Sequence, residues 1–176
     1  HLGAVGGAHE VGLFDAEEKG LLGSRHYVNH PAVPLPRTVA MLNLDMIAFS
    51  PHNECLVIGA DSAAAWPAIL ARATGGDFVF TPRAEGGAGL AFRPRGGGGG
   101  GSDHASFLRR GIPALFFFAG MNPGYHTPDD DASACDPAVA VAVLKTACTT
   151  AFLAAGWRNG LNFTGRDGGT RRSFGP

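Results

Sequence analysis

Two nearly continuous apolar runs constrain the fold of this chain more than any other feature of its sequence. Residues 37–47 read RTVAMLNLDMI, and residues 112–119 read IPALFFFA. Side chains of a strand alternate between the two sides of a sheet, so a strand that is apolar at consecutive positions needs cover on both sides. Both runs therefore predict strands of a parallel or mixed sheet with helices on each face.

Shorter apolar runs and helical signals surround these two segments. Asp136 followed by Pro137 is typical of a helix start, and Gly156 is typical of its end. We expect further strands at 9–15, 55–59 and 77–81, and helices at 19–29, 62–74, 103–110 and 136–155. This alternation predicts the α/β class, with a mixed, mostly parallel central sheet flanked by helices.

Composition narrows the class of protein further. The chain has 176 residues, of which 45% are hydrophobic, so it can build one domain core. Its formal net charge of −1 favours neither nucleic acid nor an anionic membrane as a partner. No apolar run reaches about 18 residues, so no membrane span is expected. Three cysteines are too few for a disulfide framework, and the sequence leaves open whether Cys55, Cys135 and Cys148 include one bridged pair.

Glycine is abundant and unevenly distributed. Of the 27 glycines, six form an unbroken run at 96–101. No Lys-Ser/Thr pair follows this run, so it predicts a flexible loop rather than a phosphate-binding loop. We expect one domain over residues 1–157 and a loose Gly/Arg-rich tail over residues 158–176.

Three short segments carry residue types suited to metal and acid–base chemistry. Glu17 and Glu18 follow the first predicted strand, Asp45 lies in the most apolar strand, and His126 follows the fifth strand through a Gly/Pro loop. Ligands of α/β sheets gather beyond the carboxyl ends of the strands. Carboxylates and imidazoles ligate zinc, and a second carboxylate beside a ligand can act as a base. Taken singly, each segment also fits a plainer interpretation: a surface helix turn, an ion-paired aspartate or a loop histidine.

The sequence Ser102-Asp103-His104 has the residue types of a catalytic triad. Three consecutive residues cannot converge on one another from one helix face, so we reject a triad. We expect Ser102 or Asp103 to cap the short helix that follows and to support the floor of the site.

In their order along the chain, these segments resemble the signature sequences of the co-catalytic zinc exopeptidases. That family includes secreted bacterial leucyl aminopeptidases, glutamate carboxypeptidase and the glutaminyl cyclases. The matching strings are DAEEKGLLGS at 15–24, NLDMI at 43–47, SDHASF at 102–107 with GIPA at 111–114, and YHTPD at 125–129.

The resemblance implies a role for each matching residue. Glu17 would be the general base and acid for the attacking water, and Tyr125 would hydrogen-bond the tetrahedral intermediate. Glu18 and His126 would ligate one zinc, and Asp45 would ligate a second. The implied function is a metallo-aminopeptidase that hydrolyses the N-terminal bond of a peptide substrate. Relatives of this kind are usually exported, so a secreted or periplasmic location is expected.

The chain departs from the family at its start. The intact family holds two zincs with five ligands, and an upstream His-x-Asp motif and a later Asp supply two of those ligands. His1-Leu2-Gly3 resembles the end of that motif, but too few residues separate it from the first predicted strand. The resemblance therefore implies an N-terminally truncated domain with one zinc or none. We expect Asp45 to lie on a central strand. Because the missing part includes strands, we also expect one edge of the sheet to be exposed. His9 or Glu10 is a less favoured substitute ligand.

Two other functions stay open at this point. One is a glutaminyl-cyclase-like acyltransferase, and the other is a non-catalytic interaction module of the same fold. The side-chain preference toward the substrate and the oligomeric state cannot be read from the sequence.

Overall fold

A computed structural model describes residues 9–75, 79–80, 90–97 and 100–165. Its sheet has five strands in the order β1-β5-β2-β4-β3. The strands are β1 (Met41–Leu44), β2 (Glu54–Ile58), β3 (Val79–Phe80), β4 (Leu90–Arg95) and β5 (Ala114–Phe118). Strands β1 and β5 run parallel, as do β2 and β4, whereas the β2–β5 and β3–β4 pairs are antiparallel. The sheet is mixed, and its parallel pairs span more residues than its antiparallel ones.

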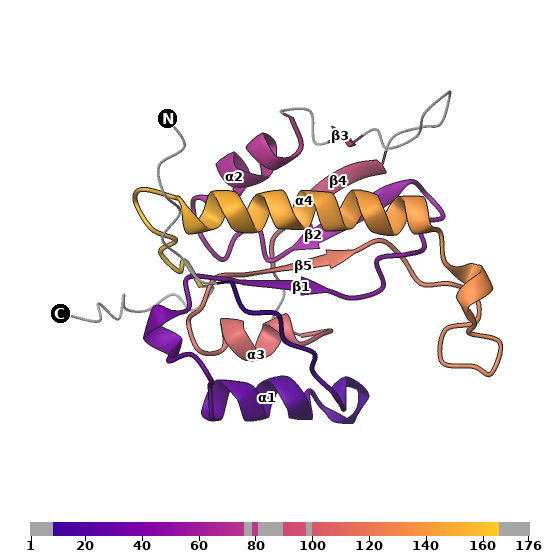
Figure 1. Cartoon of the computed structure of the whole chain (residues 1–176), viewed down its shortest axis with the longest axis horizontal. Helices are drawn as coiled ribbons and strands as arrows, with labels where there is room; N and C mark the ends of the chain where they lie inside the picture. The colour runs from indigo at the N-terminus through magenta and orange to yellow at the C-terminus, as the bar shows by residue number, and fades with distance from the viewer. Residues whose placement is uncertain (1–8, 76–78, 81–89, 98–99, 166–176) are drawn as a thin grey trace.

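Helices cover both faces of this sheet, which confirms the predicted α/β class. Figure 1 shows α2 and α4 on one face and α1 and α3 on the other. The helices are α1 (Leu22–Asn29), α2 (Trp66–Ala73), α3 (His104–Leu108) and α4 (Pro137–Ala155), with short 3-10 turns η1 (Glu17–Lys19), η2 (Leu35–Arg37) and η3 (Ala132–Ala134).

The longest helix, α4, begins where its capping signal predicts. The Asp136 carboxylate accepts a hydrogen bond from the backbone N–H of Ala138 at 2.8 Å, and Pro137 occupies the first turn. Among the described residues, α4 is the helix whose length and hydropathy would suffice to cross a membrane. A core helix has the same properties, and α4 buries Val143 and Ala147 against the rest of the domain.

The two faces of the sheet enclose different interiors. The face under α2 and α4, which we call the apolar face, packs Val57, Trp66, Ile69 and Phe117 with no exposed surface. The face under α1 and α3, which we call the polar face, has a smaller apolar cluster around Phe107. Polar side chains are also buried there: Ser24, Asn43, Ser102, Asp103, His104 and Ser106.

Two strand predictions need correction, and one strand was missed. Residues 9–15 form no strand, because an alternating segment needs a neighbouring strand to pair with, and no described strand lies beside it. The run 37–47 shortens to β1 after η2, and β1 lies at the edge of the described sheet rather than at its centre. Leu44 is accordingly 41% exposed. Strand β4 was not predicted, because Pro94 and two arginines interrupt its apolar pattern.

The first part of the expected loose tail is tied to the domain. Phe163 forms an isolated β-bridge with Ala63, and the Thr164 hydroxyl donates to the Asp61 carbonyl at 2.6 Å. Residues 166–176, the His1-Leu2-Gly3 segment and Gly98-Gly99 of the glycine run lie outside the described residues.

All three cysteines are free thiols, which settles the question that the sequence left open. Cys55 is buried, whereas Cys135 and Cys148 are exposed. Burial raises the pKa of the Cys55 thiol to about 12.

Candidate metal centre

Glu18 and His126 meet although 108 residues separate them in the chain. The His126 Nε2 atom lies 2.7 Å from the Glu18 Oε1 atom, and both side chains are more than half exposed. Glu18 belongs to η1, just before α1, and His126 lies in the loop that follows β5. Figure 1 shows this loop at the end toward which the β1 and β5 arrows point. The pair thus occupies the carboxyl edge of the parallel strands, where ligand sites of α/β sheets gather.

Asp45 lies at the same edge, directly after β1. Its Oδ2 atom accepts a hydrogen bond from the Ser102 hydroxyl at 2.8 Å. The Ser102 hydroxyl in turn accepts one from Asn43 Nδ2 at 2.7 Å. Asn43 and Ser102 are buried, so these two bonds hold the Asp45 carboxylate from beneath.

Part of the expectation for Ser102 and Asp103 was wrong. Asp103 precedes α3, but its side chain makes no capping hydrogen bond. Ser102 is instead committed to Asp45. The contribution of Asn43 was missed, although its position two residues before Asp45 places both side chains on one side of β1.

The carboxylates at this edge act on one another electrostatically. Loss of solvation raises the pKa of Glu17, and the negative charges of Glu18, Asp45 and Asp103 raise it further, while His126 opposes them. Glu17 therefore keeps its proton to a higher pH than an isolated glutamate does. A carboxyl group whose pKa lies closer to neutrality is better suited to proton transfer.

Tyr125 stands over the same group of acids. Its ring stacks on the His126 ring with centroids 3.8 Å apart. Loss of solvation, followed by the charges of Glu18, Glu17 and Asp45, raises the pKa of the Tyr125 hydroxyl. The phenol therefore stays protonated and remains a hydrogen-bond donor at this edge.

Left-handed backbone conformations cluster around these residues. Ala16, just before Glu17, has a φ of 51°, Met46, just after Asp45, has 56°, and His126 itself has 62°. Residues other than glycine rarely adopt such φ values, and backbone strain of this kind concentrates at functional sites. The His126 loop is also tight, because a Cβ atom on Gly124 would lie 2.7 Å from the Asp129 carbonyl oxygen.

The side chains at this edge are of the types that ligate zinc, but they are too few to complete a zinc site. Imidazole nitrogen and carboxylate oxygen are zinc ligands, and a catalytic zinc takes three protein ligands. Within the described part of the chain, no group of three or more His, Cys, Asp or Glu side chains is placed to hold a metal ion. Glu10 belongs to no such group, and its carboxylate accepts a hydrogen bond from the Tyr27 hydroxyl at 2.8 Å.

A flanked α/β sheet with a glutamate pair, an aspartate and a histidine at its carboxyl edge carries the residue types that metal-dependent hydrolases use. The particular family follows from comparison with known proteins. The profile of Peptidase family M28 matches residues 10–151, and the chain belongs to this family.

Similar proteins are named as aminopeptidases. The chain is 33% identical over 128 residues to Aminopeptidase YwaD of Bacillus subtilis. The aligned region covers 66% of this chain and 25% of that protein. It is 30% identical to a probable leucine aminopeptidase of Arthroderma otae, over 73% of this chain and 34% of that protein. These names give no support to the glutaminyl-cyclase alternative.

Solved structures agree with this assignment. The LapA aminopeptidase of Legionella pneumophila superposes with a TM-score of 0.61 at 25% identity, over 81% of this chain and 38% of that one. The zinc aminopeptidase BSAP from Bacillus subtilis gives 0.57 at 27% identity, over 85% of this chain and 35% of that one. The chain therefore spans between about a quarter and two fifths of the length of these proteins.

Proposed function

We propose that this protein acts as a zinc-dependent aminopeptidase that removes N-terminal residues from peptides. The observation that carries the proposal is the Glu18–His126 contact, with Glu17 beside it under the influence of Asp45. Membership of Peptidase family M28 and similarity to a zinc aminopeptidase support the same reaction.

The position of each residue at this edge indicates its role in the proposed reaction. Glu18 and His126 would hold one zinc, and Asp45, steadied by Ser102, would contribute to a second. When bound, zinc polarises the scissile carbonyl and lowers the pKa of water. Glu17 takes the proton of the attacking water and delivers it to the leaving amine, and the raised pKa of its carboxyl group favours this exchange. The Tyr125 hydroxyl donates a hydrogen bond to the oxyanion that develops on the substrate.

The same geometry limits what this 176-residue chain does alone. The residues that the structure describes offer three donors for two zincs, which leaves each zinc below the number of protein ligands that catalytic zinc takes. We therefore expect weak zinc binding and poor turnover of an aminoacyl-anilide, compared with the zinc aminopeptidase of Bacillus subtilis.

The test separates the two neighbouring glutamates. Zinc affinity is measured by competition with a chromophoric chelator for the unchanged chain, Glu17→Ala, Glu18→Ala and His126→Ala. Glu18→Ala and His126→Ala should each weaken zinc at least about tenfold, whereas Glu17→Ala should leave the affinity unchanged. Any residual turnover should be lost in Glu17→Ala, since a general base contributes about 10²–10⁴-fold.

Two outcomes would contradict the proposal. Loss of zinc in Glu17→Ala with retention in Glu18→Ala would exchange the two roles. Tight zinc binding that survives Glu18→Ala and His126→Ala together would place the metal elsewhere in the molecule.

A further inference from the structure

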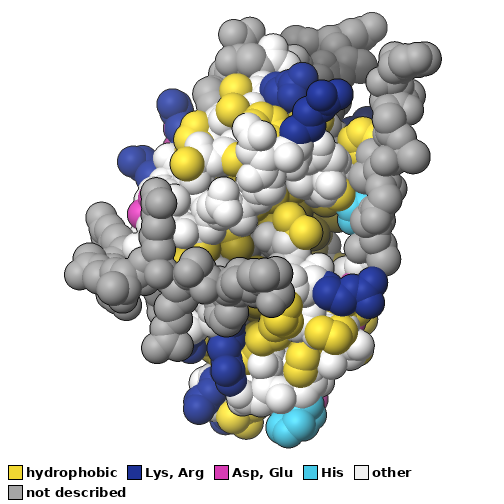
Figure 2. Space-filling view, turned by 90° about the vertical axis from the view of Figure 1, so that its left-hand side faces the viewer, with side chains coloured by type: hydrophobic (Ala, Val, Ile, Leu, Met, Phe, Trp, Pro, Cys, Tyr) yellow, Lys and Arg dark blue, Asp and Glu magenta, His cyan; other side chains and the backbone are white. Residues whose placement is uncertain are grey.

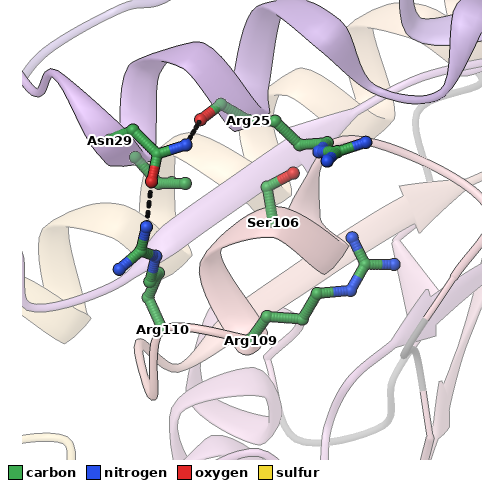
Figure 3. Close-up of a pocket in the computed structure, with 6 residues that line it drawn as sticks. Arg25, Asn29, Ser106, Arg109 and Arg110 are labelled. Carbon is green, nitrogen blue, oxygen red and sulfur yellow. Dashed lines mark hydrogen bonds between the residues drawn. The ribbon is translucent and has the colours of Figure 1, made fainter.

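A hollow lies between the carboxyl-terminal ends of α1 and α3. Its volume is about 200 Å³. Figure 3 shows Ser106 between the Arg25 and Arg109 side chains, with Arg110 on the other side of the hollow. The lining residues are Arg25, Val28, Asn29, Ser106, Arg109 and Arg110, and none of them belongs to the candidate metal centre.

The lining concentrates positive charge. Three arginines contribute, and no acidic residue is among those that line the hollow. The whole chain has a formal net charge of −1, so this concentration is a local feature rather than a general one. Figure 2 looks onto this end of the molecule, and Lys and Arg side chains are prominent there while Asp and Glu side chains are barely visible.

Hydrogen bonds hold part of the lining in place. Asn29 Oδ1 accepts a bond from Arg110 Nη2, and Asn29 Nδ2 donates to the Arg25 carbonyl oxygen at 2.8 Å. A guanidinium has five N–H donors, so the Asn29 bond leaves Arg110 with further donors. Ser106 is buried in the floor, and its hydroxyl lies 2.9 Å from the hydroxyl of Ser24.

Helix ends alone do not account for this arrangement. Cations near a helix carboxyl terminus are favourable, but exposed ones contribute only about 0.3–1 kcal/mol. One basic residue at each end would supply that contribution. Here three arginines from two helix ends instead surround one concave space.

We propose that this hollow binds a small multivalent oxyanion, namely phosphate or the phosphate group of a small phosphomonoester. Guanidinium groups match the oxygens of phosphate with paired N–H donors. The volume lies below the roughly 300–1,000 Å³ of pockets that enclose larger organic ligands, which favours a group of phosphate size. Glu17, Glu18, Asp45, Tyr125 and His126 do not line the hollow, so the site is distinct from the metal centre.

The experiment measures phosphate binding to the metal-free full chain by calorimetry at constant ionic strength. Inorganic phosphate, glycerol phosphate and acetate are titrated separately. Arg25→Gln and Arg109→Gln each remove one exposed cation from the rim. Arg95→Gln on β4 is the control, because it removes the same charge from an exposed position outside the hollow.

We expect saturable phosphate binding that weakens about tenfold or more in Arg25→Gln and in Arg109→Gln, since a hydrogen bond to a charged group contributes roughly that factor. Arg95→Gln should bind like the unchanged chain. Glycerol phosphate binding as tightly as phosphate would identify a phosphomonoester as the ligand, whereas preference for inorganic phosphate would identify the free ion. The proposal is overturned if no saturable binding is seen, if acetate binds as tightly as phosphate, or if Arg95→Gln weakens binding as much as Arg25→Gln.

Discussion

The apolar face and the polar face of the sheet differ in the side chains that fill their interiors. On the apolar face, Trp66, Ile69 and Phe117 pack with no exposed surface. On the polar face, Asn43, Ser102 and their neighbours are buried in hydrogen bonds that lead to Asp45. Large apolar side chains contribute most of the free energy of folding, whereas a buried polar side chain contributes little beyond its hydrogen bonds. The difference indicates that stability resides mainly on one face and the candidate chemistry on the other.

The largest effect is expected from Phe117→Ala on the apolar face. Removing a fully buried aromatic ring from β5 should lower the free energy of unfolding by about 3–5 kcal/mol, through lost burial and the cavity left behind. Urea denaturation followed by circular dichroism measures this change. Phe152→Ala on α4 is the control, because that ring is 47% exposed and its loss should have a much smaller effect. Equal losses in the two variants would show that the apolar face is not the stabilising one.

An intermediate effect is expected from Ser102→Ala on the polar face. The change leaves Asn43 Nδ2 and the Asp45 carboxylate each without a buried partner, which should lower the free energy of unfolding by about 1–3 kcal/mol. Thr150→Ala is the matched change on α4, where the buried hydroxyl bonds only the Thr146 carbonyl of its own helix. That variant should lose less than about 1 kcal/mol. A larger loss in Thr150→Ala than in Ser102→Ala would contradict the distinction between the two faces.

The smallest effect is expected from Asp103→Asn, and it depends on pH. Burial raises the pKa of Asp103, the charge of Asp45 adds to this, and a hydrogen bond from Ser24 opposes it. The unfolded chain therefore loses this proton at a lower pH than the folded protein. The contribution of Asp103 to stability is present below its ordinary pKa of 3.8 and is lost as the pH rises through the raised value.

Asp103→Asn removes that dependence. The free energy of unfolding of the variant, relative to that of the unchanged chain, should therefore be higher at neutral pH than near pH 4. Measuring the free energy of unfolding at both pH values separates the charge from the altered hydrogen bonds, since only the charge titrates. A stability difference that is the same at both values would show that Asp103 does not titrate above its ordinary range.

The elements that the sequence predicted well are those with local signals. Helix α4 follows from the Asp136-Pro137 start, because a cap depends on residues a few positions away. The central strands β2 and β5 follow from their apolar runs. The segment 9–15 was misjudged because alternation indicates a strand only where a partner is available, and β4 was missed because its pairing with β2 compensates for a weak local pattern.

The candidate site was predicted through resemblance rather than through spacing. No periodicity links Glu18 to His126 across 108 residues, and the matching strings alone led to the pair. The two-residue spacing of Asn43 and Asp45 places both on one side of the chain, but their connection through Ser102 depends on the tertiary packing of α3 against β1. The arginine-lined hollow gave no sequence signal either, because its residues come from two helix ends 80 positions apart.

The left-handed backbone at Ala16 and Met46 has a consequence for protein engineering. Each such residue costs of order 1 kcal/mol or more, and a chain with 27 glycines does not use glycine at either position. Ala16→Gly, at an exposed position, therefore offers a route to a more stable protein that leaves both interiors untouched, whereas Met46→Gly would also remove a half-buried side chain. Glycine at either position would also give the backbone beside Glu17 or Asp45 more freedom. A gain in thermal stability there would therefore come with a less fixed position of these two carboxylates.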